Sequence, residues 1–217
     1  DGPVKSMLKP ASEIATILGQ KGISNDKTIV LYDSGDGKYS GRVYWILDYL
    51  GAKDVKILDG HMKAWRAARK PITGNPTQIT AANFSAKANT AKIATISEVK
   101  KAVKDASYVI LDVRSEAEYK GTDANKLRPG HIPSAINLEF KNVMTARSNM
   151  KTAEELKIMF TEKGISADKT IILYCESSTR AGIVYNALHS IVKYPNVKVY
   201  DGAYLEWQTD AANAVEK

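Results

Sequence analysis

The stretch Lys163-Gly-Ile-Ser-Ala-Asp-Lys-Thr-Ile-Ile-Leu-Tyr174 decides how the chain folds, because it occurs twice. A nearly identical stretch, Lys21-Gly-Ile-Ser-Asn-Asp-Lys-Thr-Ile-Val-Leu-Tyr32, lies 142 residues earlier. Leu58-Asp-Gly-His-Met-Lys-Ala-Trp65 recurs at the same offset as Tyr200-Asp-Gly-Ala-Tyr-Leu-Glu-Trp207. Self-similarity at one fixed spacing indicates two copies of one structural unit.

The second copy alternates between apolar runs of strand length and segments of helical character. We expect strands at Tyr108–Asp112, Ala135–Asn137, Thr170–Tyr174 and Val197–Tyr200. We expect helices from a Ser97 cap to Lys104, from a Thr152 cap through Ala153 to Lys163, from Ala181 to Val192, and near Leu205. This alternation predicts an α/β fold, a mostly parallel sheet with helices on both faces.

The repeat also predicts the domain boundaries. We place one unit at residues 1–72, a linker at residues 73–91 and the second unit at residues 92–217, because Pro71–Asn83 is rich in helix breakers. At the offset of 142, Val4 corresponds to Ala146, so the first unit has no counterpart of the strand Tyr108–Asp112. A sheet without an internal strand exposes unpaired backbone and apolar surface. We therefore expect the first unit to be incomplete, with an N-terminal fragment missing.

Cys175 is the only cysteine, and it stands between the strand Thr170–Tyr174 and the helix that begins at Ala181. A lone buried cysteine is usually inert. At a strand-to-helix turn, however, successive backbone N–H groups surround the sulfur, a setting that generally favours a thiolate. Ligands of parallel sheets also bind beyond the C-terminal ends of the strands. This position predicts a nucleophilic cysteine.

Composition excludes several classes of function. The net charge of +7 comes from 31 Lys and Arg against 24 Asp and Glu, but the lysines are scattered among acids. This pattern argues against nucleic-acid binding and suits a small anionic substrate. No apolar run reaches the roughly 20 residues that span a bilayer, so no membrane partner is expected. One cysteine and three histidines predict neither an internal disulfide nor a metal site.

The compartment is not decided by the cysteine count. The chain begins Asp1-Gly2-Pro3 without a methionine, as a processed chain does. An exported or periplasmic location is therefore slightly favoured over a cytoplasmic one.

Four motifs carry a family resemblance. Cys175-Glu-Ser-Ser-Thr-Arg180, Leu111-Asp-Val-Arg114, Arg128-Pro-Gly-His-Ile-Pro133 and Tyr200-Asp-Gly202 resemble motifs of the rhodanese sulfurtransferases. The two halves together resemble a tandem rhodanese of the thiosulfate or mercaptopyruvate type. The resemblance implies that Cys175 takes a sulfane sulfur from a small anionic donor as a persulfide and passes it to cyanide or a thiol. It implies no cofactor.

The resemblance also assigns roles to residues around the cysteine. It maps a substrate cradle onto the residues that follow Cys175, namely Glu176, Ser177, Ser178, Thr179 and Arg180. Two roles are open for Arg180, which either binds the anionic substrate or ties the loop to a carboxylate. Asp112 and Arg114 are expected to form a buried pair that supports the site. Asp33 takes the place of Cys175 in the first unit and cannot carry sulfur, so that unit is predicted to be catalytically silent.

The sequence departs from the family pattern at two positions. Glu118 stands where the thiosulfate and mercaptopyruvate enzymes carry an arginine, with Arg128 as a partial substitute in support of the site. Glu176 is acidic where basic residues are typical. Acidic groups near the entrance to the cysteine loop raise the free energy of binding a doubly charged donor. The identity of the donor therefore stays open. Outside the loop, we expect His131 to be structural and Trp65 and Trp207 to be core residues.

Two alternatives to a sulfurtransferase remain. A carrier that holds persulfide without turnover would have the same fold and the same loop. A cysteine phosphatase would resemble Cys-x5-Arg, whereas four residues separate Cys175 from Arg180. The shorter loop disfavours a tetrahedral phosphate.

Overall fold

The computed structural model describes residues 4–124 and 127–217. The first half contains α1 (Ala11–Gln20), β1 (Ile29–Leu31), α2 (Lys38–Tyr49), β2 (Val55–Ile57) and α3 (His61–Ala67). The second half begins with η1 (Thr90–Lys92), β3 (Ile93–Ala94), α4 (Ile96–Ala102), β4 (Tyr108–Asp112), α5 (Glu116–Tyr119), β5 (Ile136–Asn137) and η2 (Phe140–Val143). It continues with α6 (Ala153–Glu162), β6 (Thr170–Tyr174), α7 (Ala181–Tyr185), η3 (Asn186–Ile191), β7 (Val197–Tyr200) and α8 (Ala203–Trp207).

All strand pairs in both sheets are parallel, which confirms the predicted α/β class. The second half forms a five-stranded sheet in the order β3-β7-β6-β4-β5, and the first half forms the pair β1-β2. The registers repeat with the sequence, since Ile29 pairs with Val55 as Ile171 pairs with Val197. β6 is therefore the counterpart of β1, but β6 lies in the middle of its sheet.

Side-chain caps mark the starts of α4 and α6, with one correction to the prediction. Thr95, and not the predicted Ser97, caps α4, because its hydroxyl accepts the Glu98 N–H at 3.3 Å. Thr152 caps α6 as predicted and forms a capping box with Glu155. Across the described ranges, no helix is both long enough and apolar enough to cross a membrane.

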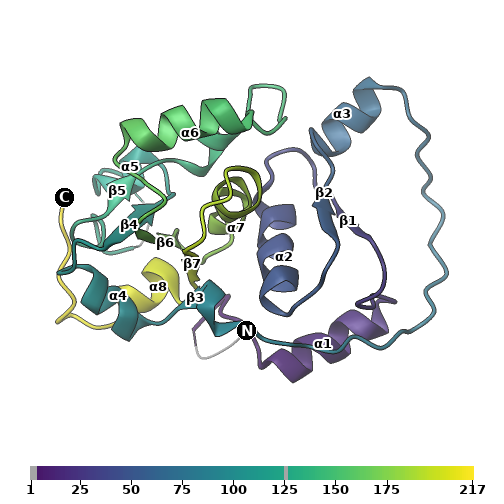
Figure 1. The fold of residues 1–217 in the computed structure, drawn as a ribbon, viewed down its shortest axis with the longest axis horizontal. Helices are drawn as coiled ribbons and strands as arrows, with labels where there is room; N and C mark the ends of the chain where they lie inside the picture. Colours follow the sequence, from purple (N-terminus) through teal and green to yellow (C-terminus); the bar gives the residue numbers. More distant parts are fainter. Residues whose placement is uncertain (1–3, 125–126) are drawn as a thin grey trace.

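The two halves meet where α2 lies beside α7, at the centre of the molecule (Figure 1). Gly41 and Gly182 touch through their backbones at this crossing. A methyl group on Gly41 would lie 2.6 Å from Ile183 Cα, and one on Gly182 would lie 2.5 Å from Arg42 N. Only glycine allows the two helices to approach this closely.

Asp59 and Asp201 occupy equivalent positions in the two halves, and each accepts a backbone hydrogen bond from the other half. Asp201 accepts the Leu8 N–H at 2.6 Å, and Asp59 accepts the Met150 N–H at 2.7 Å. Leu8 and Met150 are themselves 142 residues apart, as are Asp59 and Asp201. The halves are thus joined by two copies of one contact, which indicates an approximate two-fold relation between them.

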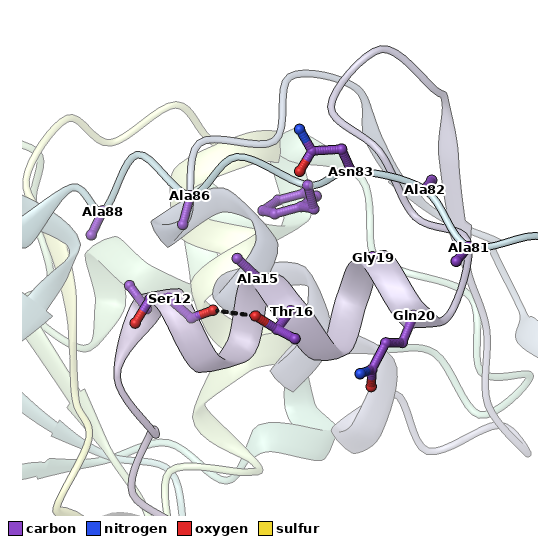
Figure 2. A pocket seen from close by; sticks show the side chains of 12 residues that line it. Ser12, Ala15, Thr16, Gly19, Gln20, Ala81, Ala82, Asn83, Ala86 and Ala88 are labelled. Carbon is purple, nitrogen blue, oxygen red and sulfur yellow. Dashed lines mark hydrogen bonds between the residues drawn. The ribbon is translucent and has the colours of Figure 1, made fainter.

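The segment between α3 and η1 runs round the outside of the first half and returns along α1 (Figure 1). Ala82 N–H donates to Gly19 O at 2.8 Å where this segment meets the helix. The cavity between them, about 600 Å³, is lined mainly by alanine, glycine and small polar residues (Figure 2). None of its lining residues is titratable, so this cavity offers no group for acid–base chemistry.

We expect Gly41→Ala to lower the free energy of unfolding by about 2–3 kcal/mol, because its Cβ would force the two helices apart. Urea denaturation followed by circular dichroism measures this change. Gly74→Ala is the matched control, since nothing lies within 4 Å of a Cβ at that position. Equal stability of the two variants would contradict a close-packed crossing.

Candidate active site

The sheet places Cys175 at the C-terminal end of its central strand. β6 pairs with β4 over its whole length and with β7 on its other side, and Cys175 follows the last residue of β6. The Cys175 side chain is fully buried, whereas Glu176, Ser177 and Thr179 are partly exposed. The predicted nucleophile therefore lies beneath a loop that faces solvent.

Hydrogen bonds hold the backbone of this loop. Tyr204 N–H donates to Cys175 O and Leu205 N–H donates to Glu176 O, both at 3.0 Å, so α8 anchors the start of the loop. Ser178 has a φ of 57°, a left-handed conformation that strains a residue with a side chain. Its hydroxyl donates to Ser177 O at 2.7 Å, which helps to stabilise the turn.

Arg180 is held by a carboxylate from another element. Its Nη1 and Nη2 atoms donate to the Glu118 carboxylate at 2.6 Å and 2.8 Å. Burial alone would raise the pKa of Glu118, but hydrogen bonds from Arg180 and Ser115 and the guanidinium charge lower it to about 2. Of the two open roles for Arg180, this geometry matches the one in which the residue ties the loop to a carboxylate.

Arg180 also places a positive charge beside the cysteine. Burial would lower the pKa of Arg180, but Glu118 and Cys175 together raise it, so the guanidinium keeps its charge. Glu118 therefore does not stand as a bare negative charge at the entrance to the cysteine loop, as its sequence position suggested. Its charge is balanced by Arg180.

Asp112 and Arg114 form the buried pair that the sequence predicted. Arg114 Nη2 donates to Asp112 Oδ2 at 2.6 Å and to Gly130 O at 2.8 Å. Tyr174 donates its hydroxyl to the same carboxylate at 2.7 Å, and the guanidinium carbon lies 4.0 Å from the centre of the Tyr204 ring. This pair links β4, the end of β6 and α8 beneath the cysteine loop.

Three other sequence expectations concern Arg128, His131 and the two repeated tryptophans, Trp65 and Trp207. Arg128 donates to Asn213 O at 2.7 Å, so its guanidinium contacts the C-terminal tail. His131 is buried, stacks on Tyr119 at 3.6 Å and contacts Tyr119 O at 2.9 Å, which matches a structural role. Trp207 is a core residue, but the prediction for Trp65 was wrong, because that side chain is only partly buried.

The first half contributes Arg42 to the cysteine loop. Its guanidinium donates to Ser178 Oγ, to Asp201 Oδ1 at 3.0 Å and to Ser6 O at 2.8 Å. Ser178 Oγ also lies 3.2 Å from Asp201 Oδ1. Sequence reasoning gave no role to Arg42, and it placed Asp201 in the motif Tyr200-Asp-Gly202 without assigning it a contact. The recurrence of Asp59 as Asp201 in the repeat was the available signal for the aspartate.

Asp33 shows what the corresponding loop of the first half does. Its carboxylate accepts N–H groups from Gly35 at 2.9 Å, Gly37 at 3.2 Å and Ser40 at 3.2 Å. Burial would raise the pKa of Asp33, but these hydrogen bonds and the nearby His61 lower it. In the first half, backbone N–H groups therefore surround the Asp33 carboxylate, which occupies the position that Cys175 takes in the second half.

The rhodanese-like domain model matches residues 4–68 and 95–210 of the chain. The chain is 31% identical over 208 residues to a thiosulfate sulfurtransferase of Gallus gallus, covering 94% of this chain and 72% of that protein. It is 30% identical to the 3-mercaptopyruvate sulfurtransferase of Homo sapiens, over 94% of this chain and 70% of that one. The sulfur carrier protein TtuD of Thermus thermophilus is 30% identical, with 90% and 73% covered.

Solved structures agree at the level of the fold. An anaerobic ergothioneine biosynthesis enzyme from Chlorobium limicola superposes on the whole chain with a TM-score of 0.89 at 23% identity. This chain spans 57% of the length of that structure. With its two matched segments, its parallel sheets and its cysteine loop, the chain belongs to the rhodanese-like domain family.

Proposed function

We propose that this protein is a sulfurtransferase that carries sulfane sulfur on Cys175. The observation that carries the proposal is the position of Cys175, which directly follows the central strand and lies beside a guanidinium fixed by Glu118. The donor is a small anionic sulfur compound such as thiosulfate, and the acceptor is cyanide or a thiol. Glu176, Ser177, Ser178, Thr179 and Arg180 form the cradle around the transferred sulfur.

In the first half-reaction the Cys175 thiolate attacks the outer sulfur of thiosulfate. A sulfur–sulfur bond forms to Cys175, the bond inside thiosulfate breaks, and sulfite leaves with the electron pair. The product is an anionic persulfide, which backbone N–H groups stabilise best when they are already in place. The Asp33 loop supports this assignment, since the same fold there directs three backbone N–H groups at a carboxylate.

In the second half-reaction the acceptor attacks the terminal sulfur of the persulfide. When the acceptor is cyanide, its carbon bonds to this sulfur and thiocyanate is released. The sulfur–sulfur bond to Cys175 breaks, and its electron pair returns to the Cys175 thiolate. No external oxidant is needed, because the sulfur changes partners without net oxidation of the protein. Such a cycle gives ping-pong kinetics.

Arg42 is a positioning residue in this proposal. It touches Ser178 and not the sulfur, and it is fixed by Asp201 and by the carbonyl of Ser6. The strained φ of Ser178 depends on these partners. The catalytically silent first half thus has a function, which is to hold the cysteine loop in shape.

A persulfide carrier is the second candidate, and one observation favours it. Arg180 makes two hydrogen bonds to Glu118, and Glu176 lies 3.7 Å from it, so two carboxylates offset its charge toward an incoming dianion. A sulfur carrier protein is also among the relatives. Steady turnover separates an enzyme from a carrier, which would retain one sulfur and release it slowly.

We expect Cys175→Ser to abolish thiocyanate formation from thiosulfate and cyanide while the circular dichroism spectrum stays unchanged, since no other residue can hold the persulfide. Asp33→Asn is the matched control in the silent loop and should retain turnover. Turnover above background in Cys175→Ser would contradict the mechanism. Persulfidation of the native protein without turnover would favour the carrier.

We expect Arg42→Ala to lower kcat by about 10- to 100-fold with a smaller change in KM, because the loop loses its alignment while the cradle residues remain. Arg42→Lys should recover only part of kcat, since one ammonium cannot replace the guanidinium fork. Steady-state kinetics of both variants measure this split. Arg66→Ala, an exposed arginine of the same half, is the control. A loss confined to thermal stability would reject the positioning role.

We expect Glu118→Gln to be less stable than the native protein by on the order of 2 kcal/mol at neutral pH. The folded protein lowers the pKa of Glu118 from 4.5 to about 2. The stabilisation is therefore complete above about pH 4.5 and is lost as the pH falls toward 2. Denaturation at a series of pH values tests this, and Arg180→Gln should remove most of the same pH dependence. A difference that persists unchanged at pH 2 would refute the ion pair as its source.

A further inference from the structure

The charged side chains that contact the cysteine loop are matched in pairs, with Glu176 left over. Arg42 reaches Asp201 at 3.0 Å, and Arg180 makes two hydrogen bonds to Glu118. Among the described residues, Glu176 forms an ion pair only with Arg180, whose Nη2 atom lies 3.7 Å from its Oε2 atom. The charge of Arg180 is already balanced by Glu118. The loop therefore carries one carboxylate in excess.

Glu176 is also the charged group of the loop that faces solvent. Its side chain is 46% exposed, whereas that of Arg180 is 19% and that of Glu118 is 8% exposed. The Glu176 backbone is fixed next to the cysteine, because its carbonyl accepts the Leu205 N–H at 3.0 Å. A molecule that approaches the loop from solvent therefore meets the carboxylate of Glu176 before the guanidinium of Arg180.

Arg180 has little capacity left for an anionic group on a substrate. Both of its terminal nitrogens donate to Glu118, at 2.6 Å and 2.8 Å. A guanidinium uses the same pair of nitrogens when it binds an incoming carboxylate with two hydrogen bonds. An acceptor with a carboxylate would therefore find this fork occupied and would be repelled by Glu176.

We propose that Glu176 selects thiol acceptors that carry an ammonium group close to the sulfur. This inference rests on the proposed function and concerns its second half-reaction. The ammonium is attracted to the Glu176 carboxylate while the thiol reaches the sulfur held on Cys175. Opposite charges at the entrance raise the rate of productive encounter, and like charges lower it. Glu176 thus determines acceptor specificity.

The transfer to such an acceptor is balanced without a further reactant. The acceptor sulfur attacks the terminal sulfur of the anionic persulfide, and a new sulfur–sulfur bond forms. The bond to Cys175 breaks, and its electron pair stays on Cys175 as the thiolate. The proton of the acceptor thiol ends on the transferred sulfur, so the product is the persulfide of the acceptor. The ammonium acts through its charge alone.

Single-turnover transfer from the sulfur-loaded protein tests this inference. The native protein is first persulfidated with polysulfide and freed of it, so that the charge of the donor has no influence. Intact-mass spectrometry then follows the loss of sulfur to three short thiols that differ chiefly in charge, namely cysteamine, 2-mercaptoethanol and thioglycolate. We expect cysteamine, which carries the ammonium, to react fastest and thioglycolate, which carries a carboxylate, to react slowest.

Variants separate the effect of Glu176 from the intrinsic reactivity of each thiol. In Glu176→Gln the ratio of the cysteamine rate to the thioglycolate rate should fall about 10-fold, and Glu176→Lys should lower it further. The native ratio should also shrink in about 1 M KCl, where the Debye length is about 3 Å. Glu154→Gln, which removes an exposed carboxylate on α6, is the matched control and should retain the native ratio.

An equal ratio in the native protein and in Glu176→Gln would overturn the inference, while sulfur transfer through Cys175 would stand. A fall that Glu154→Gln reproduces would also overturn it, by assigning the effect to overall charge. A protein that takes up no sulfur on Cys175 would instead contradict the proposed function, and the inference would fall with it.

Discussion

The backbone contact between Gly41 and Gly182 sets the distance between the two halves, and the geometry of the cysteine loop depends on it. Because α2 meets α7 without intervening side chains, Arg42 reaches Ser178 and Asp201 directly. A wider crossing would break these hydrogen bonds together. The helix–helix contact therefore also determines the geometry of the loop that carries Cys175.

Charge balance is the second organising feature of the site. Arg180 and Arg114 are largely buried cations, and each has its own carboxylate, Glu118 and Asp112. Buried charges are tolerated when they are paired and hydrogen-bonded. Pairing leaves the charged guanidinium of Arg180 fixed beside the sulfur. The acidic charge of Glu118 is thus matched by a partner within the cysteine loop itself.

The repeat allowed much of this structure to be predicted from sequence. The strand before Cys175, the Thr152 cap and the parallel sheet all follow from local pattern, because period and capping are local properties. The Glu118–Arg180 pair and the Arg42–Ser178 contact join residues 62 and 136 positions apart. Such contacts depend on how elements pack, which neither spacing nor composition encodes. Trp65 failed as a core residue for a related reason, since the segment that buries its counterpart has no copy among the described residues.

The central claim is that sulfur resides on Cys175 during the reaction. Mass spectrometry of the native protein after brief incubation with thiosulfate, with no acceptor present, tests this most directly. We expect the intact protein to gain the mass of one sulfur atom, located by peptide mapping on Cys175 and removed by cyanide. A protein of unchanged mass, or sulfur located on any other residue, would contradict the account.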